Sequence, residues 1–339
     1  MRILAMDVGH GTQDNMLYDS GENYENALKV IMPSPSRRFA ADVRASDEDI
    51  FVSGSQVGGG ELAQALTEHA ERHRVFMTEE CAYTVRNDPG EVRAKGITIA
   101  EERPEGFEGR ELRTSEPDIE DLMPLLRRFG QEPDIVAIAV QDHGTYPKGE
   151  SNRRERLKRI RERLSESRSI SSLLFERSSV PGCYTRMRSA ARNAETFFPG
   201  SEIFLMDTAI AAIAGAATEN SVVINLGNGH TMCAAISEGR VAGMFEHHTR
   251  KLDGEKLGAL VRRFMTRELG DEEVFADGGH GCFYLDAFGV PDEVIVTGPN
   301  RRLIESSGLG FRYAYPLGDA MMSGPAGMIR TIEKSYIKQ

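Results

Sequence analysis

The 339-residue sequence contains no tryptophan and few cysteines, and those cysteines stand far apart from one another. They are Cys81, Cys183, Cys233 and Cys282. Zinc ribbons and iron–sulfur clusters are built from cysteines separated by only a few residues. We therefore expect buried free thiols, and we exclude a metal cluster held by closely spaced cysteines.

Long apolar runs and an excess of basic charge are also missing. No apolar stretch reaches the roughly 18 residues that a membrane-spanning helix needs. The first residues, MRILAMDVGHG, are too short an apolar segment, and too soon acidic, for a signal peptide. With 41 basic and 52 acidic residues, the chain lacks the basic face that nucleic-acid phosphates require. These absences predict a cytoplasmic protein that binds neither membranes nor nucleic acids.

Glycine is abundant, at 34 residues, and the hydrophobic pattern between the glycine-rich turns repeats in the two halves of the chain. Each half shows three short strands, a helix, and then a parallel strand followed by a helix. Expected strands are 2–8, 15–19, 28–32, 50–53, 134–140, 202–207, 221–227, 232–236, 239–245 and 293–298. Expected helices are 61–73, 119–129, 150–168, 208–217, 253–269, a short one after 298, and 318–333. The charges of both signs in 150–168 predict a solvated helix.

This repeat predicts an α/β protein of two lobes. The first lobe would comprise residues 1–218, with a polar, irregular insertion near 86–118. The second lobe would comprise 219–317, and a C-terminal helix in 318–339 would pack back on the first lobe. A length of 339 residues agrees with two domains.

Three glycine-bearing turns carry the functional argument. Two are strand–turn–strand hairpins, one starting at Asp7 and the other at Asn225, and the third, at 297–300, joins a strand to a helix. Inward backbone N–H groups of such hairpins can hold phosphate, and a carboxylate such as Asp7 can hold hydrated magnesium. The expected nucleotide contacts are Gly9, His10, Gly11, Thr12, Gln13, Gly227, Asn228, Gly229, His230, Thr231, Gly298, Pro299 and Asn300.

The order of these turns resembles the actin-like ATPase superfamily of sugar kinases, heat-shock chaperones and actin. In that superfamily a phosphate-1 turn, a connecting helix, a phosphate-2 turn and an adenosine turn follow one another. The resemblance implies duplicated ribonuclease H-like mixed sheets flanked by helices, with ATP and magnesium bound in the cleft between two lobes. The stretch 135–142 resembles the actin strand that ends in a water-positioning glutamine, which implies a catalytic role for Gln141 and Asp142. The alanine-rich helix at 208–217 would allow close packing where the lobes meet.

Within that superfamily the whole chain is similar to an uncharacterised prokaryotic family labelled pyruvate formate-lyase activating enzyme-like. The matching segments are DVGHGTQD, VQDHG, INLGNGHT, FEHHT, DGGHG and PLGDAMMSGPAGMIR. That label implies a radical enzyme with a CxxxCxxC cluster site, which the sequence lacks. Two positions depart from the superfamily: Asn225 replaces an aspartate, and Pro299 replaces a glycine. Asp7, Asn225 and Asp207 are the expected magnesium residues, and Asn225 weakens this set because its amide is neutral.

The placement of the eight histidines is not explained by this resemblance. His10, His143, His230 and His280 each adjoin a glycine, and His247 and His248 are adjacent. One hypothesis is a second, transition-metal site formed by His143, Glu246, His247, His248 and His280, to which at most one of the adjacent histidines contributes. On this hypothesis His10, His143 and His230 line the cleft and His280 lies at its rim. The alternative is that each histidine stabilises a tight turn.

Three functions remain open at this level. The first is ATP hydrolysis or phosphoryl transfer, the second a non-hydrolysing, nucleotide-dependent activator of a partner protein, and the third a histidine–metal enzyme that reuses the cleft. The expected partners are a nucleotide and an unidentified small molecule or protein. Gly58, Gly59 and Gly60 precede a helix and form either an anion site for a second substrate or a plain helix start.

Overall fold

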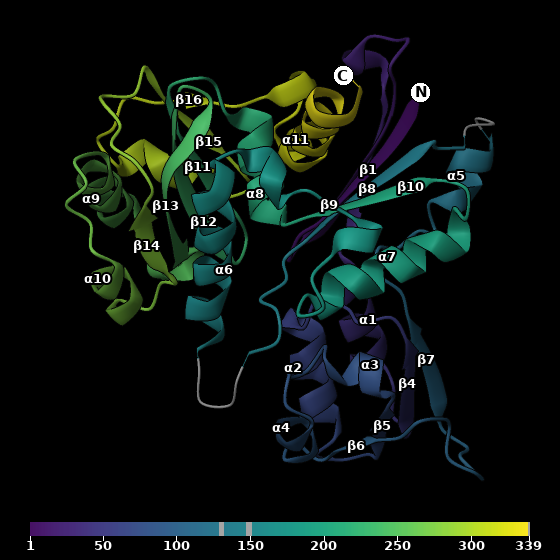
Figure 1. Ribbon diagram of the computed structural model, residues 1–339. Helices are drawn as coiled ribbons and strands as arrows, with labels where there is room; N and C mark the ends of the chain where they lie inside the picture. The colour runs from purple at the N-terminus through teal and green to yellow at the C-terminus, as the bar shows by residue number, and fades with distance from the viewer. Residues whose placement is uncertain (129–131, 147–150, 338–339) are drawn as a thin grey trace.

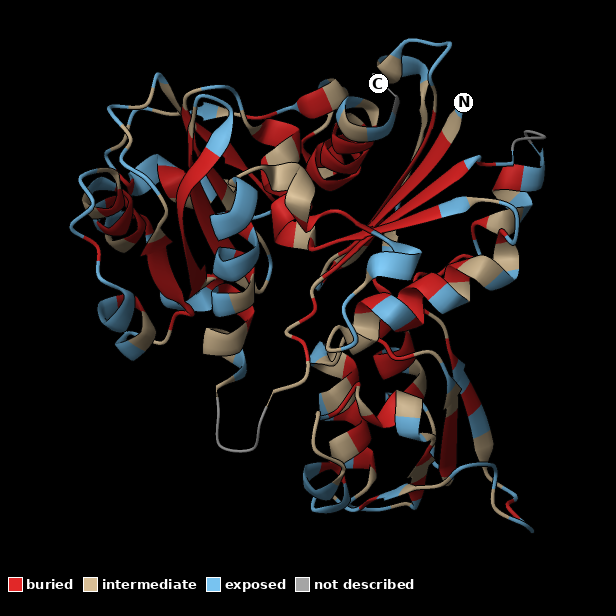
Figure 2. Ribbon diagram, in the orientation of Figure 1, coloured by how far each residue is buried: buried red, intermediate tan, exposed pale blue. Residues whose placement is uncertain are grey.

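The computed structural model describes residues 1–128, 132–146 and 151–337. In this part of the chain two six-stranded sheets lie on either side of a pair of helices, and a smaller four-stranded sheet lies apart from them (Figure 1). Figure 2 shows that the central strands of the large sheets are buried along most of their length.

The first sheet has the strand order β3–β2–β1–β8–β10–β9. β1, β2 and β3 form an antiparallel meander, and β8 and β10 run parallel to β1. The bounds are β1 Arg2–Val8, β2 Thr12–Asp19, β3 Leu28–Pro33, β8 Ile135–Val140, β9 Phe175–Glu176 and β10 Glu202–Met206.

The second sheet repeats this plan with the strand order β14–β13–β12–β11–β15–β16. β11, β12 and β13 form the antiparallel meander, and β15 and β16 continue the sheet in parallel. The bounds are β11 Ser221–Leu226, β12 His230–Ser237, β13 Arg240–His248, β14 Gly281–Tyr284, β15 Glu293–Thr297 and β16 Arg312–Tyr313. The two sheets share a five-strand order, an antiparallel meander followed by two parallel strands: β3–β2–β1–β8–β10 in one and β13–β12–β11–β15–β16 in the other. This shared order confirms the predicted duplicated ribonuclease H-like fold of the actin-like class.

Two helices, α8 (Thr208–Ala216) and α11 (Ser323–Ile332), cross between the large sheets (Figure 1). They approach closely because glycines lie at the crossing. A Cβ on Gly215 would overlap the carbonyl oxygen of Ser323, and one on Gly327 would overlap that of Ala211. The expected close packing of the small-residue helix is therefore confirmed. α11 also contacts β1, β2 and β8 of the first sheet.

The third sheet has four parallel strands in the order β6–β5–β4–β7. The bounds are β4 Ile50–Gly54, β5 Val75–Met77, β6 Ile97–Ile99 and β7 Arg110–Thr114. The prediction of an irregular segment at 86–118 is thus wrong, since it holds a helix and two strands of this sheet. These elements were missed because they are short and partly exposed, so their apolar periodicity is weak.

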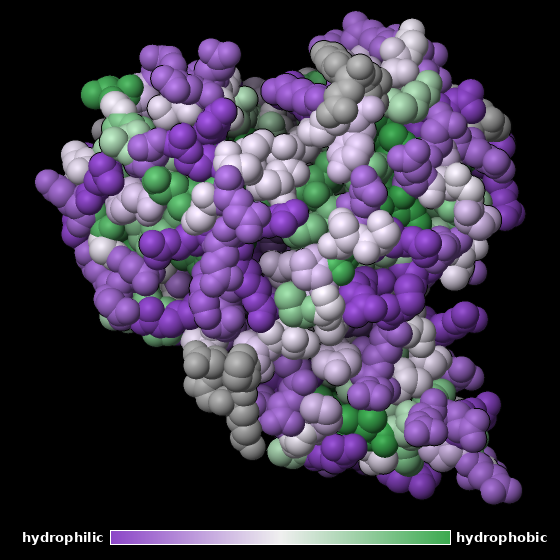
Figure 3. Space-filling view, in the orientation of Figure 1, coloured by the Kyte–Doolittle hydropathy of each residue, from purple (hydrophilic) through white to green (hydrophobic). Residues whose placement is uncertain are grey.

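The remaining α-helices cover the sheets. Their bounds are α1 Pro35–Arg44, α2 Gly60–His69, α3 Glu79–Ala82, α4 Pro89–Arg93, α5 Met123–Arg128, α6 Asn152–Ser167, α7 Thr185–Phe197, α9 Gly254–Met265 and α10 Asp271–Ala276. The segment after β15 is a 3-10 helix, Arg301–Ser306. Within the described residues, no helix has both the length and the apolar character needed to cross a membrane. Hydrophilic residues dominate the surface in Figure 3, with hydrophobic ones in small separate patches.

Candidate functional site

The two hairpin turns have the same internal hydrogen bond and face each other across a cavity. The N–H of Gly9 donates to the carbonyl of Thr12 at 2.9 Å, and that of Gly227 donates to the carbonyl of His230 at 2.9 Å. A Cβ on Gly11 would lie 2.5 Å from the Asn228 side-chain nitrogen, so the turn tips nearly touch. The duplication seen in the sheets therefore extends to the turns.

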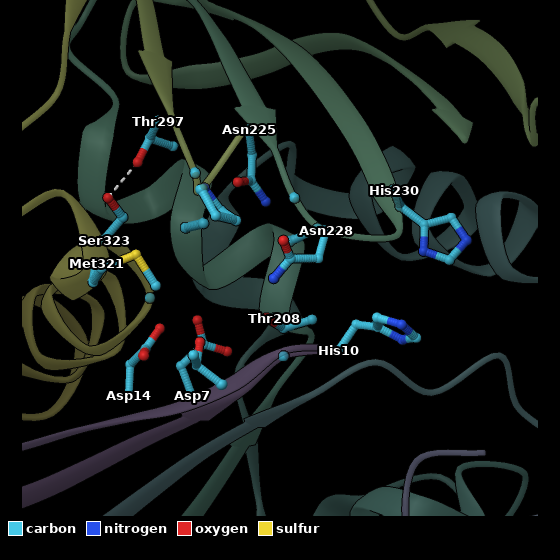
Figure 4. Close-up of a pocket in the computed structure, with 18 of the residues that line it drawn as sticks. Asp7, His10, Asp14, Thr208, Asn225, Asn228, His230, Thr297, Met321 and Ser323 are labelled. Atoms are coloured by element: carbon cyan, nitrogen blue, oxygen red, sulfur yellow. Dashed lines mark hydrogen bonds between the residues drawn. The ribbon is translucent and has the colours of Figure 1, made fainter. Parts of the chain in front are cut away.

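This first cavity, of about 100 Å³, lies where the third turn and both hairpins meet (Figure 4). The predicted site residues that line this cavity are Asp7, Gly9, His10, Thr12, Gln141, Asn225, Gly227, Asn228, Gly229, His230, Gly298 and Pro299. Asn300 lines a third cavity, of about 660 Å³, which shares Asn228 and Pro299 with the first. The first and third cavities therefore adjoin at the third turn.

Three predicted nucleotide contacts line neither of these cavities: Gly11, which lies against the Asn228 side chain, Gln13 and Thr231. Gln13 is fully buried, and its side-chain amide forms hydrogen bonds with Asn15 and with the backbone of Asp118. These bonds connect the first sheet to the segment that follows β7. Thr231 is also fully buried, and its hydroxyl bonds that of Thr249. Gln13 and Thr231 each follow, by one position, the cavity-lining residue that begins their strand, Thr12 or His230. Strand alternation therefore directs their side chains away from the cavity.

The floor of the first cavity is acidic. Asp7 on β1 pairs directly with Asp14 on β2, and both side chains are more than nine-tenths buried. Each has an Oδ1 atom that no hydrogen-bond donor reaches in the described part of the chain. Burial and the neighbouring carboxylate raise the pKa of Asp7 well above its ordinary value, and burial raises the pKa of Asp14 to about 7. Asp14 was not predicted, although the hairpin register places it opposite Asp7.

Asp207 does not line this cavity with Asp7 and Asn225. Its two oxygens accept from Arg156 at 2.7 and 2.8 Å, and its Oδ1 caps α8 by accepting from the N–H of Ala209. The arrangement therefore separates Asp207 from the other two predicted magnesium residues.

Gln141 and Asp142 follow β8, as expected, but their environments differ. The Gln141 amide lies 3.2 Å from Nδ1 of His230 and lines the first cavity. Both oxygens of Asp142 accept backbone N–H groups, from Gly144 at 2.8 Å and Met187 at 3.0 Å. Burial raises the pKa of Asp142 above its ordinary value despite these bonds. Asp142 thus orders the start of α7, whereas the Gln141 side chain lines the first cavity beside His230.

Three histidines from separate elements converge beside the first cavity. His143 follows β8, His230 begins β12, and His280 precedes β14, and one ligand atom from each lies within 4.8 Å of the others. His248, at the end of β13, lies beside this group, with its ring centroid 4.7 Å from that of His230. Burial lowers the pKa of His143 well below its usual value and that of His230 to about 3, so both rings are neutral.

His280 is the buried centre of this group, whereas the sequence analysis placed it at the rim. It is 1% exposed, and its Nδ1 lies 3.0 Å from an oxygen of Glu246. Burial would raise the pKa of Glu246, but the Arg156 guanidinium together with His280 and His230 holds that pKa well below its ordinary range. Arg156 contacts both Glu246 and Asp207, so a buried chain of charges supports the histidine.

His10 and His247 lie apart from the three. His10 faces the Gly60 backbone, with a Cβ there only 3.0 Å from its ring, and burial lowers its pKa. His247 points to the other face of β13, where Nε2 lies 2.9 Å from Asp277. The predicted second metal set is therefore divided: His247 belongs to the other side of the sheet, as alternation along a strand requires.

A second cavity, of about 580 Å³, adjoins the first. The two share Gly9, His10, Gln141, Thr208, Gly229 and His230. His143, His248 and the predicted glycine turn at 58–60 line the second cavity and not the first, with Arg86, Arg186 and Lys251. Arg250 lines the second and the third cavities. The turn at 58–60 leads into α2, so it opens a helix and lines the cleft at once.

Comparisons with known proteins complete this description. The model of the family DUF1786, described as "Putative pyruvate format-lyase activating enzyme", matches residues 57–303. No curated protein matches the chain.

Solved structures with similar coordinates include an ethanolamine utilization protein, EutJ, from Carboxydothermus hydrogenoformans, with 13% identity, 97% of this chain and 89% of that chain covered, and a TM-score of 0.38. The activator of the 2-hydroxyisocaproyl-CoA dehydratase from Clostridium difficile, with bound ADPNP, is 8% identical; 100% of this chain and 98% of that chain are covered, and the TM-score is 0.37. A glucokinase of the ROK family from Streptomyces griseus, in complex with glucose and AMPPNP, is 10% identical; 98% of this chain and 99% of that chain are covered, and the TM-score is 0.36. At these scores the fold assignment rests on the strand order.

Proposed function

This chain belongs to the DUF1786 family, and we propose that it binds a nucleotide, ATP, with magnesium in the cleft between the two large sheets and hydrolyses it or transfers its phosphoryl group. The observation that carries the proposal is the meeting of two matched glycine hairpins and the third turn around one cavity. Backbone N–H groups in such turns bind phosphate without basic side chains. The third cavity, with Asn300 and Arg301, would take the nucleoside.

Asp7 and Asp14 fit a divalent cation. Two adjacent buried carboxylates with unpartnered oxygens and raised pKa values are costly alone, and a hard cation that accepts oxygen ligands would compensate them. The cation would supply charge neutralisation for the phosphates. Asn225, across the cavity, would contribute a neutral amide, and Gln141 would orient the attacking group.

A second candidate is a nucleotide-dependent activator of a partner protein, in which binding rather than turnover is the signal. Asn225 favours it, because a neutral residue at this position anchors magnesium water less strongly than a carboxylate. The activity that the family's description names is not proposed for this chain, because a radical enzyme of that kind needs closely spaced cysteines. Cys81, Cys233 and Cys282 are instead buried free thiols on separate elements.

The proposal is tested by titration calorimetry of ATP, ADP and GTP, with and without magnesium. Gly229→Val should abolish binding, because a side chain there meets nothing in the protein and would extend into the phosphate position. Gly289→Val, in an exposed and equally open position, is the matched control. Absence of binding heat for all three nucleotides up to roughly millimolar concentration would overturn the proposal.

A further inference from the structure

We propose that His143, His230 and His280 form a binding site for a divalent transition-metal ion, zinc in the first instance, separate from the magnesium position. The three side chains come from chain segments far apart in the sequence, yet one nitrogen of each lies within 4.8 Å of the others. Ligand nitrogens on one zinc at about 2.0–2.1 Å lie roughly 3.4 Å apart, so small side-chain rotations close the site.

The hydrogen-bond pattern around the rings leaves ligand atoms free. Both ring nitrogens of His280 are buried, and neither makes a hydrogen bond in the described part of the chain. Nδ1 lies 3.0 Å from an oxygen of Glu246, close enough for the carboxylate to accept its proton after a small rotation of the ring. A carboxylate behind a histidine in this way fixes the ring and its tautomer in metal sites. The Gln141 side-chain nitrogen lies 3.2 Å from Nδ1 of His230. An amide nitrogen can only donate, so Gln141 supports a metal-bound His230 only after its amide turns and presents the carbonyl oxygen to Nδ1.

The charges behind the histidines also favour a cation. Glu246 and Asp207 carry two negative charges against the single positive charge of Arg156, in a buried position. A dication bound by the imidazoles would compensate the negative charge that Arg156 leaves. Imidazole nitrogen suits zinc, iron or nickel, whereas magnesium prefers oxygen.

Three protein ligands leave a coordination position open. His143 and His230 line the second cavity, so this position would face it and hold water or a small ligand. The metal site goes beyond the proposed nucleotide function, because metal binding by these histidines does not require a nucleotide.

The full chain is first stripped of metal with a chelator, and no nucleotide is added. It is then titrated with Zn²⁺, followed by calorimetry, and with Co²⁺, followed by visible absorption. One equivalent of either metal and ligand-field bands typical of tetrahedral or five-coordinate Co²⁺ are expected. His143→Ala should weaken zinc binding at least about tenfold, and Glu246→Gln by about 10–100-fold, as loss of a supporting partner does. His73→Ala, in the partly exposed stacked pair with His69, is the control and should bind like the wild type.

Either of two results would overturn the proposed metal site. No stoichiometric binding by the wild type, or a His143→Ala protein of unchanged affinity, overturns the site. Because His280→Ala removes a buried side chain, its folding is checked by circular dichroism, and His143→Ala and His143→Asn decide the question if it unfolds. Magnesium–ATP titrations of the same proteins are read separately, so a failed nucleotide proposal and a failed metal proposal give different results.

Discussion

Asp7 and Asp14 face each other directly across β1 and β2, and each buries one carboxylate oxygen that no donor reaches in the described residues. Gly324, at the start of α11, lies against the same carboxylate of Asp7, where any Cβ would overlap it. The acidic pair is therefore enclosed between a hairpin and a helix start.

The first prediction concerns stability and pH. An acid whose pKa in the folded protein is raised stabilises the fold below its unfolded pKa, and this stability is lost as the pH rises through the folded value. For Asp14, whose pKa rises from 3.8 to about 7, the loss falls between about pH 4 and pH 8 and is at most about 4 kcal/mol. Urea unfolding of the magnesium-free protein across this range should show it, and Asp14→Asn should flatten the curve.

Magnesium should restore the stability of the wild type above pH 7 and restore less in Asp14→Asn. The exposed Asp292→Asn is the control and should keep the wild-type profile. A wild-type stability that does not fall between pH 5 and pH 8 would contradict the assignment.

The second prediction is that Asn225→Asp strengthens magnesium binding. Asn225 lines the same cavity as Asp7 and Asp14, and a third carboxylate there raises the negative charge that a dication neutralises. We expect higher magnesium affinity in the presence of ATP, and faster basal hydrolysis, measured by calorimetry and phosphate release. A wild type that already turns over many times per second without a partner would show that Asn225 does not limit the reaction.

The third prediction separates Gln141 from its neighbour. Gln141→Ala should lower kcat and kcat/KM together by about 10–100-fold, which is about 1.4–2.7 kcal/mol of transition-state stabilisation, with little change in nucleotide affinity. Asp142→Asn should instead destabilise the fold by about 1–3 kcal/mol, because one of two buried N–H groups loses its acceptor. Single-turnover kinetics and urea unfolding distinguish the two effects, and equal kinetic losses in both variants would count against this division.

The sequence was sufficient for the duplicated sheets and for the position of the two hairpins, because buried parallel strands and glycine turns have strong local patterns. It was insufficient for α7, whose buried face is mostly alanine and therefore weakly periodic. α1 could have been found from Ser34 and Pro35, which cap and open it. The lobe boundaries at residues 218 and 317 stay a prediction.

The site was predictable where it depends on turn tips and unpredictable where it depends on partners distant in sequence. The charged run at 150–168 was expected to be solvated, and most of it is, yet Arg156 lies on the buried stripe with Leu157, Ile160 and Leu164. Its spacing of four from Ile160 was the available signal. No local sequence pattern indicates that Arg156 pairs with Glu246 and Asp207. This pairing forms only when α6, β13 and the end of β10 come together in the fold.

The last prediction tests that pairing. Arg156→Leu leaves Glu246 and Asp207 buried without their counter-charge, and such a loss destabilises a fold by about 3–5 kcal/mol. In the wild type the depressed pKa of Glu246 contributes stability above its unfolded pKa of about 4.5, and this is lost only as the pH falls through the lower folded value. In the variant Glu246 takes up a proton more readily, so the defect should shrink as the pH is lowered from 8 to 5. Urea unfolding at each pH measures this, with the exposed Arg161→Leu on the same helix as the control, and a defect that stays constant with pH would show that Arg156 acts through packing rather than charge.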